Sequence, residues 1–260
     1  AHQLPMSRGE GVRICMIDSG VDLRHPLLQG LSIEGKNFIE NELMDDLGDT
    51  MDIHHGTILA SVLVGRESLE FSGLDFSGVA PQARLIVAKI ITKDGSASML
   101  SLIRAFEYCS QKADIITLTV GGAESKILSH LMAVAKAKGV AIVATGGNSG
   151  GKLVYPASDP SVLAVGTIGQ NYKFPGSGPW DSRLAFVAPG LEVPFVTMEG
   201  EVRVMTASGF SVMYVAGVEA IRRSRGAKAL WAQQVCGVPQ ERQGQGVIDA
   251  LLTALNVNVP

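Results

Sequence analysis

The stretch that decides the fold is "VRICMIDSG", residues 12–20. After Arg13 the run is apolar up to Asp18, and a Ser-Gly turn signal follows at once. A short apolar run that ends in a turn is typical of a buried strand, and strands of this kind occur in parallel sheets covered by helices on both faces. The segment therefore predicts a buried parallel strand that ends in a carboxylate.

The rest of the chain repeats this pattern and alternates it with helices. Further buried strands are predicted at residues 83–90, 113–120, 139–145 and 162–168. Two segments between them, 98–112 and 125–139, carry apolar residues at the i, i+3, i+4, i+7 spacing of a helix: Leu102, Ala105, Phe106 and Cys109 in the first, and Leu128, Leu131, Met132 and Ala135 in the second. The alternation predicts an α/β fold with a doubly wound, mostly parallel sheet and helices on both faces. No repeat or linker interrupts it, so we expect one domain over residues 1–260.

The composition excludes several classes of protein. Hydrophobic residues make up 46% of the 260 residues and charged residues 18%, which is typical of a globular chain. The formal net charge is -3 and no long Lys/Arg run occurs, so a nucleic-acid partner is not expected. The apolar runs fall far short of the ~20 residues that span a bilayer, so no membrane span is expected. Residues 1–11 do not have the pattern of a signal peptide, and both a cytoplasmic and a secreted location stay open.

The cysteines give no framework. Cys15, Cys109 and Cys236 are odd in number and widely spaced, so the sequence predicts neither a metal motif nor disulfide pairing. Cys15 lies within the first apolar run and is interpreted as a small core residue. We therefore expect three unpaired thiols.

Polar residues that follow the predicted strands are the first candidates for a functional site. They are Asp18, residues 119–122 and Asn148, since the carboxyl ends of parallel strands meet at one edge of a sheet. A buried carboxylate needs a partner, and "HHGT" supplies His54 and His55. Adjacent histidines point apart, which disfavours a metal site with Asp52 and favours an imidazole held by Asp18.

Asn148 lies in the glycine-rich segment "ATGGNSGG", residues 144–151. The segment matches neither the dinucleotide-binding nor the P-loop pattern, so a nucleotide-binding function has little support. A side-chain amide in such a loop can donate a hydrogen bond to a developing oxyanion, although it also suits a tight turn.

Four segments occur in the order Asp, His, Asn, Ser: "MIDSGVD", "HGT", "GGNSG" and the small-residue segment at 206–217. This order resembles the subtilisin-like serine proteases, the subtilases. Supporting segments are "GVAP", "ITLTVGG", "VAPG" and "GQGVIDA" before a last helix, so the resemblance runs from about residue 12 to about residue 252.

The resemblance implies roles for individual residues. Asp18 would orient the imidazole of His55, which would act as general base, and Asn148 would donate to the oxyanion. Thr119, Val120 and Gly121 would pair with the backbone of an extended peptide, which is the expected substrate or ligand.

The nucleophile segment departs from the family. Subtilases have a segment resembling "SGTSMATPHVAG", whereas this chain has "SGFSVMYVAG" at 208–217, two residues shorter between its recognisable halves. Matching from the left places Ser211 at the nucleophile position, and matching from "VAG" places Gly209 there. Two helical residues amount to ~3 Å of rise and ~200° of rotation, so only one register can hold. In either register, Ser208 precedes the turn and is interpreted as a structural residue.

Two functions therefore stay open. The first is a serine endopeptidase in which Asp18 and His55 activate Ser211 and Asn148 stabilises the oxyanion. The second is an inactive subtilase-fold pseudoprotease, with Gly209 at the nucleophile position, that binds a peptide or a protein partner. Charged residues at Glu219, Arg222 and Arg223 suggest that the helix after "VAG" is shorter or more exposed than in the family.

No cofactor is expected. Calcium is common among subtilases, but the acidic residues of segment 67–78 form no pattern that assigns a site, so no required metal is predicted.

Overall fold

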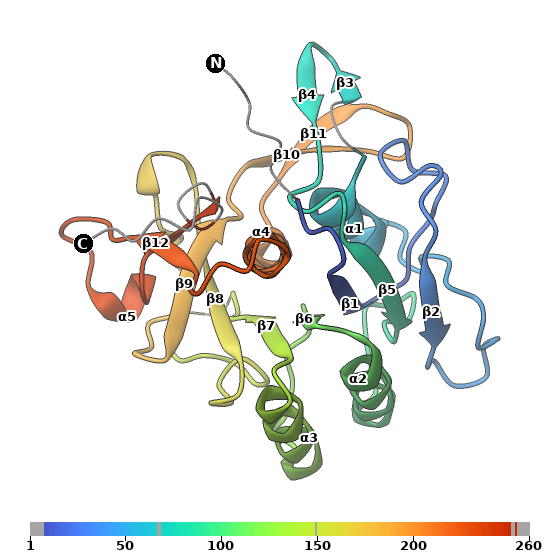
Figure 1. The fold of residues 1–260 in the computed structure, drawn as a ribbon, viewed down its shortest axis with the longest axis horizontal. Coiled ribbons are helices and arrows are strands. Elements are labelled where there is room, and N and C mark those ends of the chain that lie inside the picture. The colour runs from blue at the N-terminus through green and yellow to red at the C-terminus, as the bar shows by residue number, and fades with distance from the viewer. Residues whose placement is uncertain (1–7, 67–68, 149, 251–252, 254–260) are drawn as a thin grey trace.

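The computed structural model describes residues 8–66, 69–148, 150–250 and 253. Its centre is a nine-stranded sheet in the order β12-β13-β9-β8-β7-β6-β1-β5-β2 (Figure 1). β1 (Arg13–Asp18) lies between β5 (Arg84–Lys89) and β6 (Ile115–Leu118) and is parallel to both. The strand predicted from the opening stretch is therefore an interior strand with a parallel neighbour on each side.

The other strands of this sheet are β2 (Glu34–Asn37), β7 (Ala141–Thr145), β8 (Leu163–Ile168), β9 (Leu184–Pro189), β12 (Trp231–Gln233) and β13 (Val247–Asp249). Neighbours are parallel throughout, except that β12 pairs antiparallel with β13 at one edge. From β1 the chain goes to the edge strand β2, returns to β5 beside β1, and then continues on the other side of β1 through β6 to β9. A topological switch therefore lies between β1 and β6. The expected doubly wound, mostly parallel α/β sheet is confirmed.

Helices cover both faces of the sheet. α1 (His55–Val64) and α4 (Ser208–Ser224) lie on one face, and α2 (Met99–Lys112) and α3 (Lys126–Ala137) lie on the other (Figure 1). The predicted stripes are the faces that α2 and α3 turn to the core: all four stripe residues of α2 are buried, and in α3 only Leu131 stays partly exposed. Each face thus has its own hydrophobic core.

The expectation of a short or exposed helix after "VAG" is wrong. α4 has 17 residues and crosses the middle of one face of the sheet, and Glu219 is buried within it. Arg222 Nε and Arg223 Nε each donate to the Glu219 carboxylate at 2.6 Å. Because each arginine side chain is about a quarter exposed, the two guanidinium groups keep contact with solvent while they neutralise the buried acid.

The expectation of three unpaired cysteines is also wrong. Cys15 on β1 and Cys109 on α2 form a disulfide, with Cα atoms 5.6 Å apart and 94 residues between them in the chain. Cys236 stays free and exposed. Sequence spacing could not reveal the pair, because β1 and α2 become neighbours only when α2 packs on the sheet.

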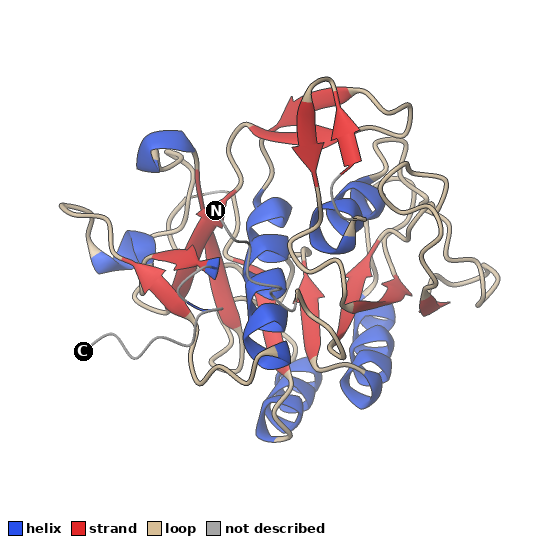
Figure 2. Cartoon of the chain, turned by 45° about the horizontal axis from the view of Figure 1, so that its top comes forward, coloured by secondary structure: helices blue, strands red, loops and turns tan. Residues whose placement is uncertain are grey.

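Smaller elements complete the structure. Two hairpins lie together near α1, at the top of Figure 2. One pairs β3 (Leu69–Phe71) with β4 (Leu74–Phe76), and the other pairs β10 (Val193–Val196) with β11 (Val202–Met205). A 3-10 turn spans Gln170–Tyr172 and a short α5 spans Gln240–Gln243. None of the helices in the described part of the chain is long and apolar enough to cross a bilayer. The last helix predicted after "GQGVIDA" falls largely outside the described residues.

Candidate functional site

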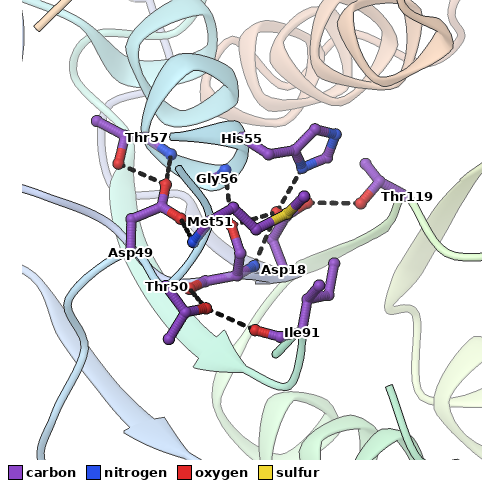
Figure 3. A network of polar contacts seen from close by, with 10 residues as sticks. Asp18, Asp49, Thr50, Met51, His55, Gly56, Thr57, Ile91 and Thr119 are labelled. Atoms are coloured by element: carbon purple, nitrogen blue, oxygen red, sulfur yellow. Dashed lines mark hydrogen bonds and ion pairs between the residues drawn. The ribbon is translucent and has the colours of Figure 1, made fainter. Parts of the chain in front are cut away.

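The switch between β1 and β6 brings together three polar residues from distant parts of the sequence. Asp18 is the last residue of β1, Thr119 follows the end of β6, and His55 is the first residue of α1 (Figure 3). Ligands of open α/β sheets bind at such a switch point, outside the carboxyl ends of the strands. The sequence prediction that Asp18 and His55 meet is therefore matched by their position in the fold.

Asp18 is fully buried, and its carboxylate accepts hydrogen bonds at both oxygens. His55 Nδ1 donates to Oδ1 at 2.7 Å, and the Ser19 backbone N–H donates to the same oxygen at 2.8 Å. Thr119 Oγ1 donates to Oδ2 at 2.5 Å. Since Nδ1 of His55 carries its proton towards Asp18, Nε2 is the nitrogen left to act on a ligand.

The two ionisable groups shift each other's pKa in opposite directions. Burial disfavours the charge on Asp18, but the charge and hydrogen bond of His55, with help from Thr119 and Ser19, lower the pKa of the carboxyl below its usual value. Burial also disfavours the His55 imidazolium, but Asp18 and the more distant Asp49 raise the pKa of the ring above its usual value. The pair is thus a carboxylate next to an imidazole that readily takes a proton.

A cleft of about 490 Å³ lies beside His55. Its walls include Met51, Ile91, residues 95–99, Leu102, Thr119 to Gly122, Tyr155 and Pro156. Thr119, Val120 and Gly121, which the sequence predicts to bind an extended backbone, all line this cleft. Most of the wall side chains are apolar, and the His55 side chain, 25% exposed, lies at its edge.

Asn148 lies in the wall of a second, smaller cavity of about 220 Å³. Ser208 and Ala207, at the start of α4, line the same cavity. The structure therefore places Asn148 and the first turn of α4 around one cavity, while His55 lines the other cleft.

Both serines of the nucleophile segment make side-chain hydrogen bonds to neighbouring strands. Ser208 Oγ accepts a hydrogen bond from Thr145 Oγ1 at 2.8 Å. Ser211 is fully buried, and its Oγ lies 3.0 Å from the Ala188 carbonyl oxygen and 3.1 Å from Thr167 Oγ1. Ser211 therefore faces β8 and β9.

Gly209 faces the opposite side of α4. A Cβ built on Gly209 would lie 3.0 Å from Leu59 Cδ1, so this position touches α1. Leu59 is four residues after His55 and lies on the same face of α1. Gly209 and Ser211 are separated by ~200° around the helix axis, so of these two positions the glycine is the one that faces α1, the helix that begins with His55. The structure does not bring Ser211 and His55 together.

The register of α4 is set by close packing further along the helix. A Cβ on Gly217 would lie 2.6 Å from the Cβ of Val79, a separation that only glycine permits. The helix runs from Ser208 to Ser224 without a non-helical residue at its start. The glycine of "VAG" thus packs closely against Val79, and α4 is a regular helix from Ser208 through Ser211.

Sequence reasoning missed two polar residues of the site. Ser19 and Asp49 belong to the same hydrogen-bond network as Asp18 and His55 (Figure 3). Asp49 is one of several acids in an exposed loop, and no spacing rule distinguishes it from Asp45, Asp46 or Asp52. Asp49 is distinguished from these acids only by its position in the folded structure, where it bonds to Ser19 and Thr57.

The expectation that the chain requires no metal stays a prediction from the sequence. Within those ranges, no group of three or more His, Cys, Asp or Glu side chains is arranged to hold a metal ion. The segment considered for calcium contains the hairpin β3–β4, closed by an edge-on contact between Phe71 and Phe76, and its first two residues lie outside the described part.

Comparison with known proteins agrees with this architecture. The sequence profile of the Subtilase family matches residues 9–236. The chain, with its doubly wound sheet and its Asp18 and His55 at the switch point, belongs to the subtilase family.

Curated relatives carry protease names. The "Thermophilic serine proteinase" of Bacillus sp. (strain AK1) is 29% identical over 83% of this chain and 53% of its own length. "Subtilisin-like protease 10" of Arthroderma otae is 28% identical over 93% of this chain and 59% of its length. The "Intracellular serine protease" of Paenibacillus polymyxa is 29% identical over 83% of this chain and 67% of its length. The chain thus spans about half to two thirds of these relatives.

Proposed function

We propose that this chain is a subtilase-fold module that binds peptide in an extended form and lacks the covalent step of a serine protease. One observation carries the proposal: the α4 residue that faces the His55 side of α1 is Gly209, which has no side chain. A nucleophile must lie within ~2.6 to 3.2 Å of its base in the working complex. Ser211, fully buried against β8 and β9, is turned away from that position.

The consequence for catalysis is large. Removal of the nucleophile from a subtilisin triad costs ~10⁶-fold in kcat, and the remaining oxyanion donor and binding cleft leave only ~10³-fold over water. Asp18, His55 and Asn148 without a nucleophile therefore amount to a binding site with residual polar groups, and not to a useful peptidase.

The cleft beside His55 supports peptide binding. The backbone after β6, at Thr119 to Gly121, lies along the cleft, where it can pair with a ligand strand without reading its sequence. Met51, Ile91 and Leu102 give the wall an apolar character that suits apolar side chains on the ligand. Peptides or proteins with an exposed, extended, apolar segment are thus the expected ligands.

The second candidate is the serine endopeptidase with Ser211 as nucleophile. The protease names of the relatives and the intact Asp18–His55 pair favour it. It requires the first turn of α4 to unwind so that the Ser211 hydroxyl leaves its acceptors on β8 and β9.

A gain-of-function experiment separates the two. Restoring the side chain with Gly209→Ser, together with Leu59→Val to make room for the new Cβ, should allow labelling by a fluorophosphonate probe. It should also raise hydrolysis of fluorogenic peptides at least ~10²-fold over the matched Gly209→Ala/Leu59→Val control, since a triad nucleophile is worth ~10⁶-fold.

Two outcomes would contradict the proposal. Labelling of the unaltered protein that disappears in Ser211→Ala would establish the endopeptidase. A folded Gly209→Ser/Leu59→Val protein that stays inert would show that Gly209 is not the missing group.

Peptide binding has its own test. A Cβ on Gly122 meets nothing within 4 Å, and Gly122 lines the cleft, so Gly122→Phe should fill the cleft without disturbing the core. Gly176 also has open space around its Cβ but lies outside this cleft, which makes Gly176→Phe the matched control. With fluorescein-labelled apolar octapeptides, we expect Gly122→Phe to weaken binding at least ~10-fold, equivalent to ~1.4 kcal/mol. Equal affinity of both variants would remove the cleft from the proposal.

A further inference from the structure

The helix that carries His55 begins without a cap of its own. The residue before it, His54, adopts a left-handed conformation with φ 50° and makes no side-chain capping hydrogen bond. The first backbone N–H groups of a helix have no partner within the helix and need acceptors from elsewhere. The position of His55 therefore depends on groups outside α1.

Two residues from other segments supply these acceptors. Ser19 Oγ accepts from the Gly56 N–H at 3.0 Å. Asp49 Oδ2 accepts from the Thr57 N–H at 2.8 Å and from the Thr57 hydroxyl at 2.7 Å. A carboxylate at this end of a helix also interacts favourably with the helix dipole.

The same two residues are linked to each other and to Asp18. The Ser19 hydroxyl lies 2.8 Å from Asp49 Oδ1 and 3.2 Å from Asp18 Oδ1. A hydroxyl has one proton, and the shorter distance assigns its donation to Asp49. The Met51 N–H also donates to Asp49 Oδ1, at 3.2 Å. Both oxygens of Asp49 are thus occupied by donors from the β1 turn, its own loop and α1 (Figure 3).

We propose that Asp49 is a positioning residue for His55: it ties the first turn of α1 to the Ser19 turn and so keeps His55 Nδ1 on Asp18. The turn after β1 and the start of α1 are joined closely enough that Gly56 has no room for a side chain, because a Cβ there would lie 2.2 Å from the Gly20 carbonyl oxygen. The role of Asp49 holds whether the chain cuts peptides or only binds them, since it concerns the imidazole and not the nucleophile.

Asp49 also acts on His55 through its charge. In the described structure, the carboxylates that favour the protonated ring are Asp18 and, at longer range, Asp49. Lys89, which is opposite Asp18 in the sheet register, pairs instead with Glu42 and Asp46. The β6 end presents the neutral Thr119, and residues 208–213 of α4 carry no titratable side chain. Removal of the Asp49 charge should therefore destabilise the imidazolium.

The test is an NMR titration of the His55 ring in the full chain. In Asp49→Asn we expect a lower pKa of His55 and weakening of the downfield Nδ1 proton signal that reports the bond to Asp18. Asp52→Asn is the matched control, because Asp52 belongs to the same loop but is 81% exposed and pairs with Lys93. That control should leave both signals of His55 unchanged, and His55→Gln assigns the resonances.

A structural role alone would change only the melting temperature, so the two readouts separate positioning from general stabilisation. A folded Asp49→Asn protein with an unchanged pKa and an unchanged Nδ1 proton would overturn the proposal. Should Asp49→Asn not fold, Ser19→Ala breaks the same link and leaves both carboxylates in place. It should weaken the Nδ1 proton signal, and an unchanged signal there would equally overturn the proposal.

Discussion

The starts of α1 and α4 lie against each other, yet they differ in how their polar groups are bonded. At α1, Asp18, Ser19 and Asp49 converge on the helix start and hold His55 at the edge of an open cleft. At α4, the N-cap residue is an alanine, Ser208 Oγ accepts from Thr145 Oγ1, and the Ser211 hydroxyl is buried against β8 and β9. Polar groups from other segments thus converge on the start of α1, whereas the hydroxyl groups at the start of α4 bond to β7, β8 and β9.

This difference shows that the two helix starts are stabilised in different ways. A glycine at position 209 leaves no side-chain polar group to be paired, and Leu59 packs against α4 where a side chain would lie. Removal of Asp18 or Ser19 would instead leave donors without acceptors in a buried network, at ~1–3 kcal/mol each. The α1 half is therefore retained partly by its own hydrogen bonds.

The largest expected effect on stability comes from the disulfide that joins β1 to α2. In the described chain, no disulfide joins α4 to the sheet. Cys15→Ala/Cys109→Ala should lower the free energy of unfolding by about 4–5 kcal/mol, because the disulfide closes a long loop in the unfolded chain. Urea unfolding of this variant and of the parent protein measures the difference. Free thiols at both positions in the folded, unreduced protein would contradict the pairing.

A smaller effect on the free energy of unfolding is expected from Ser211→Ala, which tests the contrast between the starts of α1 and α4. Ser211→Ala removes a buried donor from the carbonyl groups of β9 and should cost ~1–3 kcal/mol of stability. If the hydroxyl serves the fold, peptide affinity at the cleft stays the same. Isothermal titration with an apolar octapeptide, beside urea unfolding, tests both statements, and a loss of binding without a loss of stability would refute the structural role of Ser211.

The smallest effect is the pH dependence contributed by Asp18 and His55. Because the pKa of Asp18 is lowered in the folded state, its contribution is present above the unfolded-state value of ~3.9 and is lost as the pH falls through the folded-state pKa. Because the pKa of His55 is raised, its contribution is complete below ~6.5 and is lost as the pH rises through the folded-state pKa.

The pair should therefore stabilise the protein most between about pH 4 and 6.5. Stability curves measured against pH for the parent protein and for Asp18→Asn should differ in shape above pH 6.5, where the decline due to His55 disappears in the variant. Parallel curves would mean that His55 is not coupled to Asp18.

The sheet and its helices were predictable because they depend on local patterns, and the Asp18–His55 pair because a buried carboxylate needs a partner and the order of motifs resembles the subtilases. An apolar run with a carboxylate at its end specifies a buried strand and its edge, and helical spacing specifies which face of α2 is buried. The same rule singled out Thr119, Val120 and Gly121, which follow β6, and Asn148, which lies three residues after β7. Their roles stay predictions. The disulfide and the Asp49 network were not predictable, because each joins segments that only the fold brings together. The burial of Glu219 was not predictable either, because it depends on the packing of α4 against the sheet, although its partners Arg222 and Arg223 are on the same helix.

The sequence by itself determined the subtilase architecture and the two candidate registers of the nucleophile segment, since both are written in residue order and spacing. Tertiary structure alone decided which register α4 adopts. The close contact of Gly217 with Val79 leaves the helix no freedom to slide, and the ~200° between neighbouring candidates then turns Ser211 to the core and Gly209 towards the helix of His55. The orientation of a helix about its own axis is set by its packing, and the amino-acid sequence alone does not reveal it.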